Sequence, residues 1–284
     1  MDNSTSIETY GDKELLNPVR SVCKIKITIL NRKDIEYWGT GFVFFDNFLL
    51  TNAHLFNDLK ETDTVEIVTT FNYEHEPKTN YWKLCENVYL NKDLDFAILR
   101  LFPELSSVIP PGLLKRVGPL PEKGKACIIR HPHGDVKGFE CIQIIEKDER
   151  INAIKLHLSQ YNGTIKSEQE LISQGIKKIL PGGALAKECV TYNTVVMKHG
   201  SSGSPVFDEY GNLIGLHTGG YKHKCQDGSE QTAIAYAISL LYIIKSIVSV
   251  LREKNDEMLL ANITEEAKGN QYLNNILYEE LYLS

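Results

Sequence analysis

Residues 200–207 read GSSGSPVF, a pattern that predicts a tight turn followed by a strand. Gly200 and Gly203 allow backbone conformations that other residues avoid, so this turn can push the side chain of Ser202 outward. The same turn can aim the N–H groups of Gly200 and Ser202 at one point, as an oxyanion hole requires. Pro205 begins the strand, where its missing N–H is tolerated. Taken alone, the motif also fits an ordinary glycine-serine turn between strands.

A second motif, LLTNAHLF at residues 49–56, places His54 just beyond a strand that ends at Thr51. A residue at that place is held rigidly and can still reach into a cleft, as a general base must. A serine hydroxyl is a poor nucleophile at neutral pH and needs such a base. We therefore pair His54 with Ser202, although a lone histidine is more often a capping or core residue.

A third motif, DLDFAILRL, begins at Asp93 and places Asp95 at the mouth of a strand buried on both sides. A carboxylate there is largely desolvated, which is costly unless charge-assisted hydrogen bonds compensate. The N–H of His54 can provide one such bond, and the hydroxyl of Thr218 is the candidate for another. Asp93 is the rival carboxylate, but its position further out is typical of a solvated turn residue. We predict that Asp95 orients the ring of His54.

The order of the three residues is that of the chymotrypsin class, since subtilisin-like enzymes and α/β-hydrolases use other orders. A segment rich in proline and glycine, residues 110–121, indicates a linker that separates His54 and Asp95 from Ser202. Many short strand-like runs with turn residues between them favour a sandwich or barrel. Strands and helices do not alternate along the sequence, so a parallel sheet is not expected. We predict an all-β fold, a chymotrypsin-like double antiparallel β-barrel with a C-terminal α-helix.

The expected domain covers residues 19–253. Its predicted parts are a first barrel over about 19–111, a linker over about 112–124, a second barrel over about 125–238 and a helix over about 239–253. Ser239 is the expected N-cap of that helix. Its apolar stripe consists of Leu240, Leu241, Ile244, Ile247, Val248 and Leu251. Residues 254–284 form a tail that can add another helix, and residues 163–182 are polar and can include a short one that starts near Ser167.

Composition narrows the classes of function. The chain has 284 residues with a net charge of −6, so no basic excess favours direct binding of nucleic acid. The sequence contains no run of 18 apolar residues, so we expect no membrane span. The HxH pair of His131 and His133 has no third ligand at a useful spacing, so we expect loop structure there, with no metal and no cofactor.

The cysteines and the first residues bear on the compartment. The six cysteines are widely scattered without a CxxC pair, which favours free thiols in a reducing compartment. The first sixteen residues, MDNSTSIETYGDKELL, lack the basic and apolar regions of a signal peptide. We expect an intracellular protein of the cytoplasm or nucleus that is not secreted.

These motifs resemble a known family. GTGFVFF, LLTNAHL, DFAIL and GSSGSPVF resemble the trypsin-like peptidases in general. A closer resemblance is to the intracellular serine proteases called "family with sequence similarity one hundred eleven", on HPHG at 131–134, GSSGSPVFDEYGNLIGLHTGG at 200–220 and AIAYAISLLYIIKSI at 233–247. The resemblance covers roughly residues 20–250.

The resemblance implies a two-barrel serine protease that carries its triad on His54, Asp95 and Ser202. It also implies cleavage after aromatic or large apolar residues, and a nuclear, chromatin-linked role in the clearance of DNA–protein crosslinks. It would allow a homodimer that orders the oxyanion turn. In secreted zymogens an aspartate at the place of Ser201 pairs with a newly freed N-terminal amine, and a neutral serine cannot form that ion pair.

The primary specificity pocket can also be placed by counting. In this fold its floor lies about six residues before the nucleophile, at Val196 here. The opposite wall should come from Thr218, Gly219 and Gly220. No acidic residue lies along the strand that is expected to contain Val196. A lysine or arginine side chain in the pocket would therefore find no counter-ion. We therefore predict an endopeptidase that cuts protein or peptide substrates after Phe, Tyr, Leu or Met. A peptide-binding pseudoprotease on the same fold remains the alternative.

Overall fold

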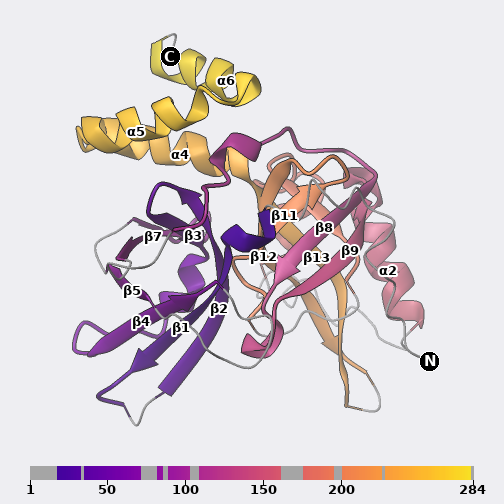
Figure 1. The fold of residues 1–284 in the computed structure, drawn as a ribbon. Coiled ribbons are helices and arrows are strands. Elements are labelled where there is room, and N and C mark those ends of the chain that lie inside the picture. Colours follow the sequence, from indigo (N-terminus) through magenta and orange to yellow (C-terminus); the bar gives the residue numbers. More distant parts are fainter. Residues whose placement is uncertain are drawn as a thin grey trace.

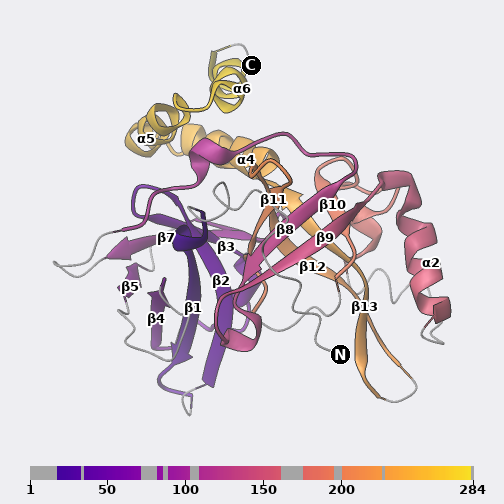
Figure 2. The same cartoon turned by 45° about the vertical axis from the view of Figure 1, so that its right-hand side comes forward.

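The computed structural model describes residues 18–32, 35–71, 82–85, 89–102, 109–160, 175–194, 200–225 and 228–282, with only the backbone described at 82–85. Figure 1 shows two β-units side by side, with three helices stacked above them at the C-terminal end. The view in Figure 2 shows the same arrangement, with the longest of these helices lying over the junction of the two units.

The first unit is an antiparallel sheet that closes on itself. Its strands are β1 (Val22–Ile29), β2 (Ile35–Phe45), β3 (Phe48–Thr51), β4 (Val65–Thr70), β5 (Trp82–Cys85), β6 (Leu90–Asn91) and β7 (Phe96–Phe102). They follow the order β3-β2-β1-β4-β5-β7-β6, and β3 also pairs with β7. Alternating side chains of these strands, among them Ile25, Ile27, Val43 and Leu99, fill the interior. The β3–β7 pairing places the segments that follow β3 and precede β7 at one end of this unit.

The second unit is a closed barrel. Its strands are β8 (Lys125–Arg130), β9 (Gly138–Ile145), β10 (Cys189–Tyr192), β11 (Pro205–Asp208), β12 (Leu213–Lys224) and β13 (Glu230–Ser239). They close in the order β10-β13-β12-β11-β8-β9. Small and branched apolar side chains such as Ile128, Val206, Ile214 and Ala237 pack inside. The double-barrel architecture predicted from the motifs is confirmed.

The segment between the two units is bonded to both of them. Leu113 donates its backbone N–H to the carbonyl of Val43 in the first unit, over 2.9 Å. Gly118 donates to the carbonyl of Leu213 in the second unit over 3.1 Å, beside a parallel bridge between Val117 and Leu213. The linker is therefore attached to both barrels by backbone hydrogen bonds and helps to fix the distance between them.

Helices cover the outside of the barrels. The α-helices are α2 (Arg150–Gln160), α4 (Leu240–Glu253), α5 (Glu257–Ala267) and α6 (Gln271–Tyr282). The 3-10 helices are η2 (Ala53–Phe56), η3 (Leu114–Arg116), η4 (Pro132–Gly134), η5 (Lys147–Glu149) and η6 (Lys177–Ile179). The predicted cap of α4 is confirmed, since the Ser239 hydroxyl accepts the N–H of Tyr242 over 3.3 Å. Ile243 takes part in the buried stripe of α4, where Leu241 was expected and is only partly buried.

The expected tail is a pair of helices that pack back onto the fold. Ile263 and Ala267 of α5 and Leu273 and Leu277 of α6 are buried in the main core. The side-chain amide of Asn270, between the two helices, donates to the carbonyls of Lys115 and Val117 in the linker at 3.0 and 2.7 Å. The tail thus holds the linker that joins the barrels.

Two elements were not predicted from the sequence. One is strand β10, which ends at Tyr192, and residues 195–197 beyond it lie outside the described part. The strand is set by its pairing with β13 at Cys189–Tyr192, which local sequence does not reveal. Helix α2 was not predicted, because only Ile154 and Leu158 are apolar residues buried on it. The short helix expected near Ser167 falls outside the described residues.

The described part of the chain contains free thiols and no helix that could span a membrane. The five cysteines whose side chains are described are free, and most of them are buried. Burial raises the pKa of the Cys23 and Cys127 thiols to about 12 and that of Cys189 to about 11, so these groups stay protonated at neutral pH. None of the described helices is long and apolar enough to cross a membrane.

Candidate active site

The structure brings His54, Asp95 and Ser202 into one hydrogen-bonded line. His54 lies in η2 directly after β3, and Asp95 lies directly before β7. Because Thr51 of β3 pairs with Ala97 of β7, His54 and Asp95 meet at one end of the first barrel. Nδ1 of His54 lies 2.7 Å from Oδ2 of Asp95, and Nε2 lies 2.7 Å from Oγ of Ser202.

Asp95 is held in an unusual backbone conformation. Its φ is 52°, in the left-handed region that aspartate tolerates better than most residues. Its Oδ1 accepts the backbone N–H of His54 over 2.8 Å, so the carboxylate bonds His54 at two places. The amide of Asn52 donates to the Asp95 carbonyl over 2.8 Å. The rival Asp93 is exposed in the turn before Asp95, as expected for a solvated residue.

The partner expected for the Asp95 carboxylate is wrong. The hydroxyl of Thr218 donates its single proton to the carbonyl of Leu216 over 2.9 Å, so it has none left for Asp95. The backbone N–H of His54 takes the place that Thr218 was expected to fill. Sequence reasoning also missed Asn52, two residues before His54 in the same motif, whose amide lies 3.5 Å from the Thr218 hydroxyl. An amide next to the base was the signal that could have pointed to it.

The oxyanion turn depends on two glycines in the left-handed region, with φ of 88° at Gly200 and 85° at Gly203. A Cβ on Gly203 would lie 2.1 Å from the carbonyl oxygen of Thr40, so this position has no room for a side chain. The carbonyl of Ser201 accepts from both the N–H and the hydroxyl of Ser204, at 3.2 and 2.7 Å. Among the described residues, no hydrogen-bond acceptor is found for the N–H groups of Gly200 and Ser202.

Ser201 sits at the end of a buried polar chain. It is 1% exposed, and its hydroxyl accepts from Nη1 of Arg130 over 3.3 Å. Nη2 of Arg130 lies 2.5 Å from Oε2 of Glu140, and the other carboxylate oxygen accepts the hydroxyl proton of Thr194 over 2.7 Å. Sequence reasoning missed this chain, since Arg130 and Glu140 come together only through the pairing of β8 with β9.

The expected specificity pocket is described in part. Val196 lies outside the described residues. Thr218 is buried, and Gly219 and Gly220 are half-buried on β12. A Cβ on Gly219 would lie 3.2 to 3.4 Å from the ring of Tyr236, its cross-strand partner on β13. Tyr236 is thus an aromatic neighbour of this wall that the sequence did not single out.

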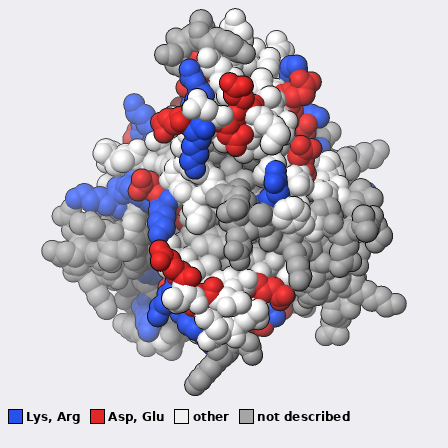
Figure 3. Space-filling model, turned by 90° about the vertical axis from the view of Figure 1, so that its left-hand side faces the viewer, with Lys and Arg blue, Asp and Glu red and all other residues white. Residues whose placement is uncertain are grey.

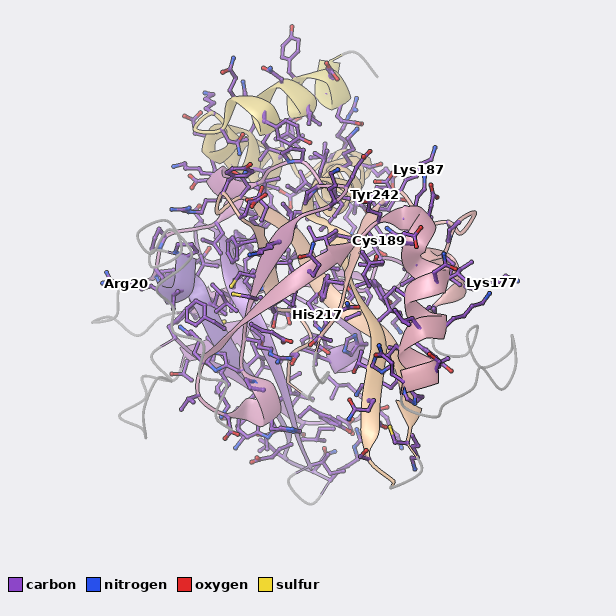
Figure 4. The ribbon with its side chains drawn as sticks, turned by 90° about the vertical axis from the view of Figure 1, so that its right-hand side faces the viewer. Arg20, Lys177, Lys187, Cys189, His217 and Tyr242 are labelled. Atoms are coloured by element: carbon purple, nitrogen blue, oxygen red, sulfur yellow. The ribbon has the colours of Figure 1, made fainter. Side chains whose placement is uncertain are left out.

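Three buried aromatic residues of the second barrel are His217, Tyr192 and Tyr236. His217 lies among the strands of this barrel (Figure 4), and its Nδ1 lies 2.5 Å from the hydroxyl of Tyr192. Complete burial lowers the pKa of His217 to about 3, with the charge of Arg130 as a smaller cause. Burial and the charge of Asp95 raise the pKa of Tyr236. Burial also raises the pKa of Tyr192, so His217, Tyr192 and Tyr236 are all uncharged at neutral pH.

The HxH pair divides between two environments. His131 is fully buried with its Nδ1 3.0 Å from the carbonyl of Asp135, and burial lowers its pKa to about 3. His133 is exposed at the tip of η4 with a φ of 55°. The described residues contain no group of three or more His, Cys, Asp or Glu side chains that could hold a metal ion.

Charges of both signs are mixed on the described surface. On the face shown in Figure 3, Lys and Arg side chains lie among Asp and Glu side chains over the helices at the top. Several charged side chains of the described residues form ion pairs, including Lys245 with Glu280 and Lys115 with Glu266. The described residues on this face therefore form no continuous basic field.

Comparison with protein families gives a match to this arrangement. The family model described as the trypsin-like peptidase domain matches residues 39–216, which run from β2 through β12 and include His54, Asp95 and Ser202. The chain belongs to the trypsin-like peptidase family. Among individual trypsin-like peptidases, human serine protease FAM111B is 28% identical over 254 residues, which are 82% of this chain and 34% of that protein. Mouse serine protease FAM111A is 27% identical over 204 residues, 67% of this chain and 33% of that protein.

The chain thus spans about a third of the length of these curated relatives, and the resemblance noted in the motifs is confirmed. Solved trypsin-like structures share the fold. The inactive form of Rv3671c from M. tuberculosis aligns with a TM-score of 0.52 at 15% identity, over 86% of this chain and 93% of that chain. The HtrA-type protease AlgW with a tripeptide aligns with a TM-score of 0.53 at 16% identity, over 85% of this chain and 63% of that chain.

Proposed function

We propose that this trypsin-like peptidase is a serine endopeptidase that hydrolyses peptide bonds through an acyl-enzyme formed on Ser202. The observation that supports this most is the line Asp95–His54–Ser202, with 2.7 Å at both side-chain contacts. A nucleophile that is not fully buried, a base within hydrogen-bond reach and a third group that orients the base together meet the requirements of nucleophilic catalysis.

In the proposed mechanism, Nε2 of His54 takes the proton of the Ser202 hydroxyl as Oγ attacks the carbonyl carbon of the substrate. The tetrahedral intermediate carries its negative charge on the former carbonyl oxygen, where the N–H groups of Gly200 and Ser202 donate hydrogen bonds. His54 then gives its proton to the leaving amine. Water repeats the sequence on the acyl-enzyme and releases the acid product. Asp95 keeps the proton of the neutral ring on Nδ1 and stabilises the imidazolium that forms.

For specificity, we propose a preference for large apolar or aromatic residues before the cut. Thr218, Gly219 and Gly220 carry no acidic group, and two glycines place no side chain across the entrance. The phenol ring of Tyr236 lies against Gly219 and adds an aromatic surface. A lysine or arginine side chain would be buried there without a counter-ion, which costs more than its alkyl stem gains.

The test uses peptides matched except at the residue before the cut, with Phe, Leu, Ala, Lys or Arg there, and compares kcat/KM. Wild type should cleave the Phe and Leu peptides best. Ser202→Ala should lose about 10⁴-fold or more in kcat, because the triad acts as a unit. Ser159→Ala, on the exposed face of α2, is the matched control and should keep full activity.

A serine-reactive fluorophosphonate probe separates an enzyme from a pseudoprotease. Wild type and Ser159→Ala should be labelled, and Ser202→Ala should not. If wild-type protein is folded but takes no label and cleaves none of the peptides, the proposed activity is wrong and the alternative of a peptide-binding module stands. A preference for Lys or Arg before the cut would contradict the proposed neutral pocket and leave the proposed endopeptidase activity standing.

A further inference from the structure

Thr40 joins the first barrel to the oxyanion turn of the second. It lies in β2, is fully buried, and is 160 residues away from Gly200 in the sequence. Its backbone N–H donates to the carbonyl of Ser202 over 2.9 Å, and its hydroxyl donates to the carbonyl of Gly200 over 2.7 Å. We propose that Thr40 is a positioning residue for catalysis, which holds the oxyanion turn in its active shape from the opposite barrel.

The hydrogen bonds of Thr40 act on alternate peptide planes of the turn. The hydroxyl fixes the plane between Gly200 and Ser201 through its carbonyl, and the N–H of Thr40 fixes the plane after Ser202 in the same way. The plane between them is held by Ser204, which donates twice to the carbonyl of Ser201. In a trans peptide the N–H points opposite to the carbonyl. Pinning the Ser201 carbonyl therefore aims the N–H of Ser202, and pinning its neighbours keeps that plane from rotating.

The hydroxyl of Thr40 also bonds the turn that lies behind Gly200. It accepts the backbone N–H of His131 over 3.0 Å while it donates to Gly200, so one oxygen atom connects three segments. A Cβ on Gly200 would lie 2.5 Å from the carbonyl of His131 and 3.0 Å from the nitrogen of Gly134. The buried, neutral ring of His131 closes its own turn through Asp135. The HPHG motif therefore lies directly against the oxyanion turn and is connected to it through the hydroxyl of Thr40.

Thr40 itself is fixed from the first barrel. The hydroxyl of Thr51, the last residue of β3, donates to the Thr40 carbonyl over 2.7 Å. Thr51 is three residues before His54, so the same strand end positions the base and the residue that holds the oxyanion turn. The base and the oxyanion donors are thereby kept in register across the two barrels.

This role rests on the proposed function and predicts where the damage of a mutation will appear. Thr40→Val keeps the shape of the side chain and removes the hydroxyl, so the carbonyl of Gly200 loses its donor. A misplacement of about 1 Å at a catalytic group can cost about 10²-fold in rate. The oxyanion exists only in the transition state, so the loss should fall on kcat and spare KM. We expect kcat to fall about 10- to 100-fold.

The experiment compares three variants of the full chain. Thr40→Val is the test, and Thr40→Ser should restore kcat to within about threefold of wild type because it keeps the hydroxyl. Thr69→Val is the matched control. Thr69 is fully buried in the same barrel, and its hydroxyl also donates to a carbonyl, that of Lys24 over 2.8 Å, away from the turn. Melting temperatures of all variants report on folding.

A second measurement separates positioning from general damage. A peptide boronic acid forms a tetrahedral adduct on Ser202 and needs the oxyanion hole, whereas the same peptide with a hydrogen atom in place of the boronic acid group has no atom to put there. Thr40→Val should weaken the boronate about 10- to 100-fold and leave the Kd of the hydrogen-terminated peptide within about threefold. Thr69→Val should change neither.

Each outcome decides the matter. If Thr40→Val equals Thr69→Val in kcat and in boronate affinity, the role of Thr40 is wrong while the proposed activity stands. If wild-type protein cleaves no peptide, the proposed activity fails and this role fails with it. Should Thr40→Val not fold, Thr40→Ala replaces it, and equal kcat for Thr40→Ala and Thr40→Ser would overturn the role of the hydroxyl.

Discussion

Replacing Asp95 by asparagine tests the orientation of His54 without removing an atom from the site. The carboxylate accepts two hydrogen bonds from His54, from its backbone N–H at 2.8 Å and from its ring Nδ1 at 2.7 Å. Asparagine has one acceptor oxygen and one donor nitrogen. If the oxygen keeps the backbone N–H, the amide nitrogen faces Nδ1 and must donate to it. The ring proton then moves to Nε2, and His54 can no longer accept the proton of Ser202.

The expected loss is large because the wrong tautomer removes the base itself. We expect kcat for Asp95→Asn to fall about 10⁴-fold at neutral pH, with little change in KM. The backbone should tolerate the change, since asparagine adopts the left-handed region at least as readily as aspartate, and Asp95 has a φ of 52°. The melting temperature should therefore stay close to that of wild type.

The assay is steady-state hydrolysis of the best peptide of the matched series, with burst kinetics to separate acylation from deacylation. Asp93→Asn is the control, because Asp93 is exposed in the same turn and should lose less than about twofold. An Asp95→Asn variant that folds and keeps more than about a tenth of wild-type kcat would refute the orienting role. A severe loss in Asp93→Asn would move that role to Asp93.

Two further predictions concern stability. Arg150 is 3% exposed and donates to the carbonyls of Ile179, Ala186 and Cys189 and to the Thr191 hydroxyl, so Arg150→Met should lower the free energy of unfolding by about 3 kcal/mol. Lys155→Met, on the exposed face of the same helix, should change it by less than about 0.5 kcal/mol in urea unfolding, and equal effects would contradict the buried network. His131 and His217 have pKa values of about 3 in the folded state, below the ordinary 6.5. As the pH falls below 6.5, the unfolded chain therefore binds protons at these two side chains that the folded chain does not bind. Stability should therefore decrease from pH 6.5 toward pH 5, by up to about 1.4 kcal/mol per pH unit for each histidine. His217→Gln should reduce this slope and the exposed His133→Gln should not, and a stability that is flat over this range would contradict the prediction.

The sequence by itself determined the features that depend on local pattern. The turn around Ser202, the strand end before His54 and the apolar strand after Asp95 are each visible as short motifs, and their order indicates the class of fold. The cap and the buried face of α4 also follow from local periodicity, which is why Ser239 was identified. These features are encoded by residues close together in the chain, where side-chain preferences and backbone sterics act directly.

Only the tertiary structure decided which groups bond one another across the site. The pairing of Thr51 with Ala97 brings the base to Asp95, and the approach of the two barrels brings Thr40 to Gly200. Thr218 illustrates the limit, since its strand was predicted near the site and its hydroxyl was then found bonded to Leu216. Strand register and barrel packing are sums of many small contacts between distant segments, and a shift of one residue turns every side chain of a strand to the other face. The partners of a buried hydroxyl or carboxylate are therefore a property of the assembled barrels, and no short stretch of this chain contains them.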